Sequence, residues 1–182
     1  AQTHIVGLAT NVQFLRRVAR TDSFARAKLD TALIQREQAV LFHQEPVGLP
    51  LAAAAAVAQT LLHERASEGV DPFSRRDGFH THGVVQRRFE FEFAGEHVKA
   101  SLTYERGGSL TLSVGSGEAM VTSPLVFEQR AGGIELQFAG QRTRAAVYPQ
   151  GEVDHVFTPL GATQITSIDL LAHSGETAAE GG

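Results

Sequence analysis

Cysteine is absent from this 182-residue chain, which excludes disulfides and thiolate metal sites. The chain also lacks an excess of positive charge, because its formal net charge is -4. A negative net charge argues against nucleic-acid binding through bulk charge. No run of about 18 apolar residues occurs, so no membrane span is expected. The chain opens without a signal-peptide pattern and without an initiator methionine, as expected for part of a longer protein.

The short motifs of common catalytic sites are missing as well. The sequence contains no GxSxG, P-loop, HExxH or GxGxxG. Asp154 and His155 could form a catalytic triad with Ser167, but nothing in the sequence orders the three. We therefore predict no catalytic or cofactor-binding residue. The sequence contains no set of catalytic residues that would support the alternative of a free-standing enzyme.

Histidine provides one metal hypothesis. His80 and His82 are two residues apart and would share a face of a strand, so together with His97 or His155 they could bind zinc. No carboxylate joins them at a suitable spacing, and we predict no metal site.

The composition is that of a folded domain. Of the residues, 42% are hydrophobic and 20% are charged, which is enough apolar material for a core. A chain of this length is expected to form one domain, or one domain with a tail.

Residues 49–68 form the most distinctive stretch, LPLAAAAAVAQTLLHERASE. Pro50 suits the first turn of a helix, five consecutive alanines follow, and Gly69 suits the end. The first half of this helix carries no charge on any face, which is typical of a helix buried on all sides. Two interpretations remain open: a helix packed on one side only, or a central rod surrounded by the later strands.

Short helices are predicted in residues 1–45. Thr10 or Asn11 can cap VQFLRRVAR, Asp22 or Ser23 can cap SFARAKL, and a third helix, TALIQREQAVLF, follows Asp30 or Thr31. The cluster of Arg16, Arg17 and Arg20 fits a solvated helix face or, alternatively, a phosphate site. The prolines and glycine of HQEPVGLP place a domain boundary after residue 45.

From residue 84 onward the hydrophobic pattern has a period of two, and glycine-containing turns interrupt it at short intervals. This pattern predicts eight strands of about 6 to 11 residues joined as hairpins. We expect the first turn at Gly95-Glu96, a bulge or an edge at Pro124, and a bulge near Ile165 and Ile168. The charged residues of the first strand, Arg87 and Arg88 with Glu90 and Glu92, are expected to face solvent.

Eight hairpin-linked strands with one apolar face predict an up-and-down antiparallel barrel. The fold class is therefore α+β, with an eight-stranded antiparallel barrel wrapped around the long helix and preceded by a helical tail. The alternative is a lipocalin-like barrel that binds a small molecule, which requires a ligand cavity that an internal helix would abolish.

The segment between helix and barrel has the composition of a binding surface. It holds two phenylalanines and two arginines, residue types enriched among interface anchors: Phe73, Arg75, Arg76 and Phe79. The alternative is that the two rings fold back to plug the mouth of the barrel. We predict these four residues as partner contacts.

Two stretches resemble the α subunits of biotin-dependent acyl-CoA carboxylases. Gly7, Thr10 and Asn11, with residues 30–34, resemble the end of the biotin carboxylase domain, where a GxxTN segment opens a helix. Residues 49–171, with DPFSRRDGF before the first strand, resemble the bridging domain that follows, and most closely that of 3-methylcrotonyl-CoA carboxylases. The chain would then divide into the end of a biotin carboxylase domain (1–45), a bridging domain (46–174) and a linker toward a biotin carrier domain (175–182).

The resemblance implies an assembly role rather than chemistry. The bridging domain docks the biotin-carrying α subunit onto the carboxyltransferase β subunit, through a hook-like loop that corresponds here to residues 70–83. Biotin, ATP and Mg²⁺ would belong to the parent ligase and none of them to this chain, which should be inactive alone. Expected partners are the β subunit and the biotin carboxylase and carrier domains, with no nucleic acid or membrane. The location would be a bacterial cytoplasm or, in a eukaryote, the mitochondrial matrix; the acyl-CoA (methylcrotonyl, geranyl or propionyl) is not specified.

Overall fold

A computed structural model describes residues 4–6, 12–27, 32–41, 47–67 and 85–168. The chain divides into two compact units, Ala1–Pro46 and Val47–Gly182. The predicted assignment of the first unit to a biotin carboxylase domain stays a prediction.

The first unit contains four short helices: α1 (Val12–Val18), α2 (Asp22–Ala25), α3 (Leu33–Arg36) and α4 (Gln38–Leu41). The cap of α2 is Thr21, whose hydroxyl accepts a hydrogen bond from the Phe24 amide at 3.2 Å, so the prediction of Asp22 or Ser23 was wrong. The third predicted helix is divided into α3 and α4.

Arg17 in this unit is not a freely solvated side chain. Its guanidinium donates to the Leu41 carbonyl at 3.1 Å, which ties α1 to the end of α4. The last carbonyls of a helix have no hydrogen-bond donor within the helix, so they are natural acceptors for an arginine. Arg20 is exposed, as predicted for a solvated helix face.

The long helix, α5 (Leu49–Ser67), has Pro50 in its first turn and 19 residues, so it is about 28 Å long. Its eight residues 51–58 are consecutive and all buried, and six of them have an exposed fraction of zero. Because an α-helix turns about 100° per residue, an uninterrupted run of this length is buried in every direction. The interpretation as a central rod is therefore confirmed.

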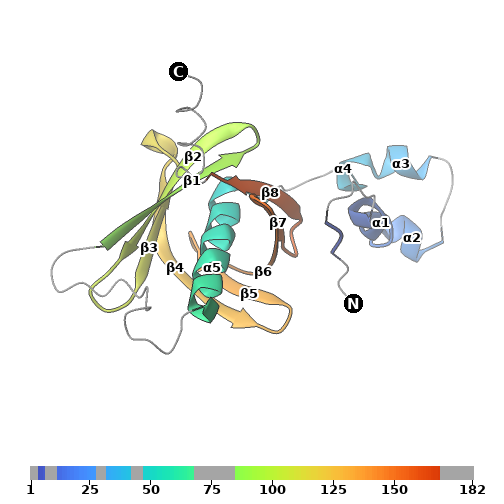
Figure 1. Cartoon of the computed structure of the whole chain (residues 1–182). Helices are drawn as coiled ribbons and strands as arrows, with labels where there is room; N and C mark the ends of the chain where they lie inside the picture. Colours follow the sequence, from blue (N-terminus) through green and yellow to red (C-terminus); the bar gives the residue numbers. More distant parts are fainter. Residues whose placement is uncertain (1–3, 7–11, 28–31, 42–46, 68–84, 169–182) are drawn as a thin grey trace, which may run out of the picture. The chain divides into compact units, whose positions relative to one another are not determined.

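Eight antiparallel strands follow and form a closed barrel in chain order (Figure 1). They are β1 (Val85–Phe93), β2 (Glu96–Tyr104), β3 (Leu110–Val114), β4 (Val121–Arg130), β5 (Gly133–Phe138), β6 (Gln141–Gln150), β7 (Val153–Phe157) and β8 (Ala162–Ser167). The barrel closes where Phe91 of β1 pairs with Ser167 of β8. The predicted fold class is confirmed, with strands of 5 to 10 residues.

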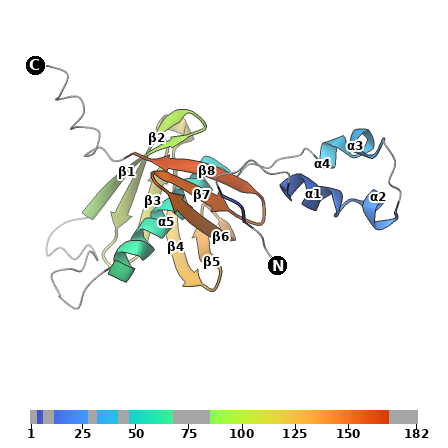
Figure 2. The same ribbon diagram turned by 45° about the vertical axis from the view of Figure 1, so that its right-hand side comes forward.

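Helix α5 runs through the barrel, as Figures 1 and 2 both show. It packs against β1 and against each strand from β3 to β8. The inward residues of the strands are mostly aliphatic or phenylalanine, and with the alanines of α5 they form one core. The interior space that a lipocalin-like barrel would offer to a ligand is occupied by α5.

Two hairpin turns use alanine in a left-handed conformation. Ala94 and Gly95 have φ of 53° and 82°, and Ala139 and Gly140 have φ of 49° and 75°, which are type I′ values. The register pairs Phe93 with Glu96, so the first turn lies one residue earlier than predicted and Glu96 already belongs to β2.

Of the two predicted irregularities, one is confirmed. Pro124 pairs with Thr111 of β3, whereas β5 pairs only with residues 126–130 of β4. Pro124 is therefore paired on one side only, as predicted for an edge position, and the predicted bulge near Ile165 and Ile168 is absent from the described strands. Strand β8 pairs with β7 in continuous register and ends at Ser167, so Ile168 lies beyond it.

A search of the described helices found none that combines the length and the apolar character needed to cross a membrane.

Candidate functional site

The four residues predicted to contact a partner, Phe73, Arg75, Arg76 and Phe79, lie outside the described residues. The two ends of the connecting segment are described: α5 ends at Ser67 and β1 begins at Val85. The candidate site is therefore the end of the barrel where these two elements meet.

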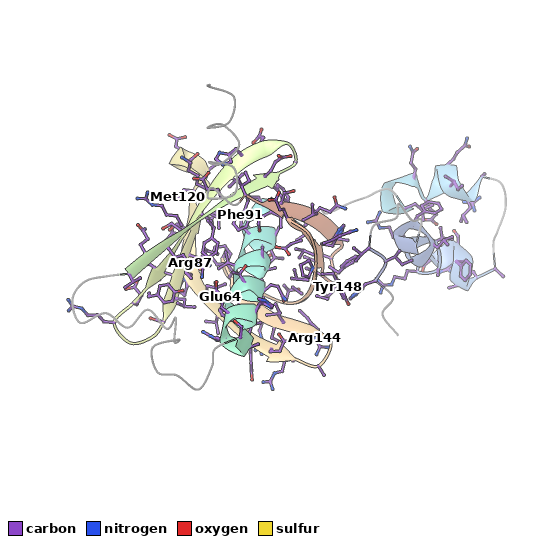
Figure 3. The ribbon with its side chains drawn as sticks, viewed as in Figure 1. Glu64, Arg87, Phe91, Met120, Arg144 and Tyr148 are labelled. Carbon is purple, nitrogen blue, oxygen red and sulfur yellow. The ribbon has the colours of Figure 1, made fainter. Side chains whose placement is uncertain are left out.

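An ion pair joins the two elements across this end. The Arg87 guanidinium donates to both carboxylate oxygens of Glu64, at 2.6 and 2.8 Å (Figure 3). The side chains are 34% and 17% exposed, so the pair is largely shielded from water. Two parallel charge-assisted hydrogen bonds fix direction as well as distance. We call the Glu64–Arg87 pair the clamp.

The prediction that Arg87 faces solvent was wrong. Alternate residues of a strand share a face, and Arg87 has the same parity as Phe89 and the buried Phe91. Arg87 therefore points inward at the mouth of the barrel, where Glu64 on the last turns of α5 meets it. The parity was visible in the sequence, but the charge of the side chain was given more weight than its position.

Arg87 is held by more than the carboxylate. Its guanidinium lies 4.7 Å from the centroid of the Phe89 ring, and Phe89 is stacked on Phe91 with centroids 6.2 Å apart. The hydrogen bond to Glu64 raises the pKa of Arg87 above its usual value, against the opposing effect of burial, with the charge of Glu64 and Tyr104 as further contributions. Arg87 stays charged at any physiological pH.

A second arginine secures the opposite side of the helix end. The guanidinium of Arg65 lies 5.0 Å from the centroid of the Phe127 ring in β4. Neighbouring residues of α5 thus contact β1 and β4, two strands on different sides of the barrel. Positive charge near the last turn also suits the negative end of the helix dipole.

The metal hypothesis gains no support from the described residues. His80 and His82 lie outside them, and within the described ranges no group of three histidine, aspartate or glutamate side chains could hold a metal ion. His97 instead lies 2.8 Å from the carboxylate of Glu90.

The triad of Asp154, His155 and Ser167 is not assembled. The two ring nitrogens of His155 lie 3.2 Å from Gln150 and 3.3 Å from Gln164. Asp154 lies on the inner face of β7, opposite to its neighbour His155. Burial raises the pKa of the Asp154 carboxyl, an effect that His155 partly opposes.

The clamp therefore has a structural consequence for the connecting segment. It joins residues 64 and 87, and the segment of residues 68–84 lies between them. With the ends of α5 and β1 held together, both attachment points of this segment are fixed on one end of a rigid barrel.

Fold and site together define a class: a helix-filled antiparallel barrel in which an ion pair joins the end of the helix to the first strand. The family of methylcrotonyl-CoA carboxylase alpha-subunit BT domains matches residues 48–170, which is more than half of the chain. The chain belongs to this family, and the resemblance of its barrel half is confirmed.

A curated relative agrees with this assignment. The mitochondrial methylcrotonoyl-CoA carboxylase subunit alpha of Dictyostelium discoideum is 26% identical over 110 residues. The aligned region is 58% of this chain but 16% of that protein, so the chain spans only a small part of the relative's length.

Proposed function

We propose that this chain is the assembly module of a biotin-dependent acyl-CoA carboxylase, of the methylcrotonyl-CoA type. It docks the biotin-carrying α subunit onto the carboxyltransferase β subunit. The parent enzyme would carboxylate its acyl-CoA with ATP and bicarbonate through biotin, and its ATP, Mg²⁺ and biotin sites would lie in other domains. The observation that carries this proposal is the family match over residues 48–170.

The geometry of the barrel end supports a docking role. The clamp and the Arg65–Phe127 contact fix the end of α5 and the start of β1, between which residues 68–84 lie. The proposed contacts in that segment are Phe73, Arg75, Arg76 and Phe79. Aromatic and arginine side chains are the usual composition of an interface hot spot.

The test is binding of the 182-residue chain to the purified β subunit, by pull-down and by size-exclusion chromatography, without ATP or biotin. A stable complex is expected. Replacement of Phe73 and Phe79 by alanine should weaken binding by several kcal/mol, about a hundredfold or more, while the melting temperature stays unchanged. Loss of folding instead would show that the two rings plug the barrel.

Absence of binding by the wild-type chain would refute the proposal. A fatty or acyl ligand in the purified protein, together with absent binding, would revive the small-molecule interpretation.

A further inference from the structure

The first strand of the barrel has a neighbour on both sides over only part of its length. All nine residues of β1 pair with β2, whereas β8 pairs with β1 at Phe91 and Glu92. The N–H of Ile168, the last residue of the described range, adds a bond to the Glu90 carbonyl at 2.8 Å. Residues 85–89 therefore lie beyond the end of β8, and Figures 1 and 2 both show the start of β1 projecting past it. We call the side of residues 85–89 that faces away from β2 the open edge.

The backbone groups at the open edge follow from the bond to Glu90. In an antiparallel sheet, successive residues of a strand direct their N–H and C=O groups to alternate sides. The Glu90 carbonyl faces β8, so the N–H and C=O groups of Gln86 and Arg88 face the open edge. Those of Arg87 and Phe89 face β2 instead. Within the described residues, two N–H and two C=O groups thus have no strand opposite them, and such a row is a template for one more strand.

The side chains leave the open edge accessible. Gln86 and Arg88 are both exposed and lie on the outer face of β1. Side chains of a strand stand roughly perpendicular to the sheet, so they do not lie across the backbone groups at its edge. A strand can therefore approach from this side without displacing any described element.

Another half-paired strand of the barrel is protected in a way that β1 is not. Residues 121–125 of β4 pair with β3 but not with β5. Pro124 in this stretch has no N–H to offer, and the Ser123 hydroxyl accepts a hydrogen bond from the Ala139 amide at 3.2 Å. Natural sheets use proline in this way to prevent the addition of a strand. Residues 85–89 contain no proline, so their donors remain available.

The charges of β1 make a second copy of this chain a poor occupant of the open edge. Two copies paired antiparallel about a two-fold axis at residue 88 would place Arg88 opposite itself, and an axis at residue 87 would do the same for Arg87. Like charges directly opposite each other in a sheet are destabilising. A segment of a different protein is free of this constraint.

We propose that an extended segment of the carboxyltransferase β subunit adds to the barrel as a strand at the open edge of β1. This inference rests on the proposed function and adds the mode of binding, which is recognition through main-chain hydrogen bonds. In the sequence, β1 follows directly on residues 68–84, which include the four proposed partner contacts. A β subunit bound to those residues would have the open edge within reach.

The test is amide hydrogen exchange of the 182-residue chain, alone and in complex with the purified β subunit, read by mass spectrometry with electron-transfer fragmentation. The reporters are the N–H groups of Gln86 and Arg88. The matched controls are the N–H groups of Arg87 and Phe89, which face β2. In the free chain the reporters should exchange fast and the controls slowly. In the complex the reporters should slow by about tenfold or more and approach the controls.

Proline variants test the main-chain bonds directly. Gln86→Pro and Arg88→Pro each remove one N–H from the open edge, whereas Gln86→Ala and Arg88→Ala keep the N–H and remove only the side chain. Each proline should raise the dissociation constant for the β subunit about 2- to 12-fold relative to its alanine control, as expected for one hydrogen bond. Urea unfolding verifies that each variant is folded. The exchange measurement uses the wild-type chain and stands even where a proline variant fails to fold.

Fast exchange of both reporters in a complex that does form would overturn the inference while the proposed function stands. Slow exchange of the reporters in the free chain would also overturn it, because another part of the chain or a second copy would then already occupy the edge. Equal losses of binding in the proline and alanine variants would assign the effect to the side chains and contradict a main-chain mode. Absence of binding by the wild-type chain would refute the proposed function, and the inference with it.

Discussion

The clamp should be measurable as an interaction energy in a double-mutant cycle. The variants are Glu64→Gln, Arg87→Met and their combination, which remove each charge separately and then both. The two contacts of 2.6 and 2.8 Å make the geometry favourable, and the pair is 17% and 34% exposed. Exposed pairs contribute about 0.2 to 1 kcal/mol, whereas breaking a fully buried pair costs about 3 to 5 kcal/mol. For this intermediate burial we expect a coupling of about 1 to 2 kcal/mol.

The assay is urea unfolding followed by tyrosine fluorescence. The chain has no tryptophan and two tyrosines, Tyr104 and Tyr148, and both lie in the barrel unit, so the signal reports on that unit and not on α1 to α4. The midpoint should fall in each single variant while the slope stays constant, as for a change in stability alone.

A second ion pair in the same unit serves as the matched control. Glu128 and Arg130 also have a contact of 2.6 Å, but their side chains are 59% and 52% exposed. The cycle Glu128→Gln with Arg130→Met should give a coupling below about 0.5 kcal/mol. A clamp coupling no larger than this control would show that Glu64 and Arg87 do not brace the barrel end.

Two further predictions concern stability and use the same assay. Gly133 has φ of 148°, and an added Cβ would lie 2.5 Å from the carbonyl oxygen of Ala145 in β6. Gly133→Ala should therefore lower the free energy of unfolding by about 2 kcal/mol or more. Gly132 has open space around it, so Gly132→Ala should lower the free energy of unfolding by only about 1 kcal/mol. Equal losses would contradict the close approach of the two backbones. For Asp154, burial raises the pKa above 3.8, so the folded state binds the proton more tightly than the unfolded one and wild-type stability falls as pH rises through the folded pKa. Asp154→Asn removes this loss, so the variant should match the wild type below pH 3.8 and exceed it above the folded pKa; a difference independent of pH would disprove the assignment.

The barrel and its helix could be predicted because each has a simple periodic signature. Inner and outer residues of a strand alternate, and Val98, Ala100 and Leu102 are buried while Lys99 between them is exposed. A helix without a polar face has no stable place on a surface, so the run of alanines already implied burial.

The details that failed were those in which local sequence permits two answers. The sequence allows Gly95 to be either the first or the second residue of the hairpin turn between β1 and β2. Only the pairing of Phe93 with Glu96 shows that it is the second. Thr21 and Asp22 can both cap α2, and the backbone placed the threonine hydroxyl at the Phe24 amide.

The clamp was missed for a different reason. Arg87 has inward parity, but an arginine is stable there only because Glu64 arrives from another element. The partner is 23 residues away in the sequence, and no local pattern links the two. A charged residue at an inward position is therefore a signal worth following to a partner.

The position of the inward charges limits where this domain can act. In the described strands the charged residues at inward positions are Arg87 and Asp154, the first at the start of β1 and the second next to the β6–β7 turn. Both positions lie at the barrel end where α5 finishes, because successive strands are antiparallel. The rest of the interior consists of the alanines of α5 and apolar strand residues. The small alanine side chains keep α5 thin enough for the barrel to close around it. Packing of α5 against the strands fills the space that a ligand would need. A barrel filled in this way has only its outer face and its ends available for recognition. The clamp lies at one of those ends, where α5 finishes and β1 begins.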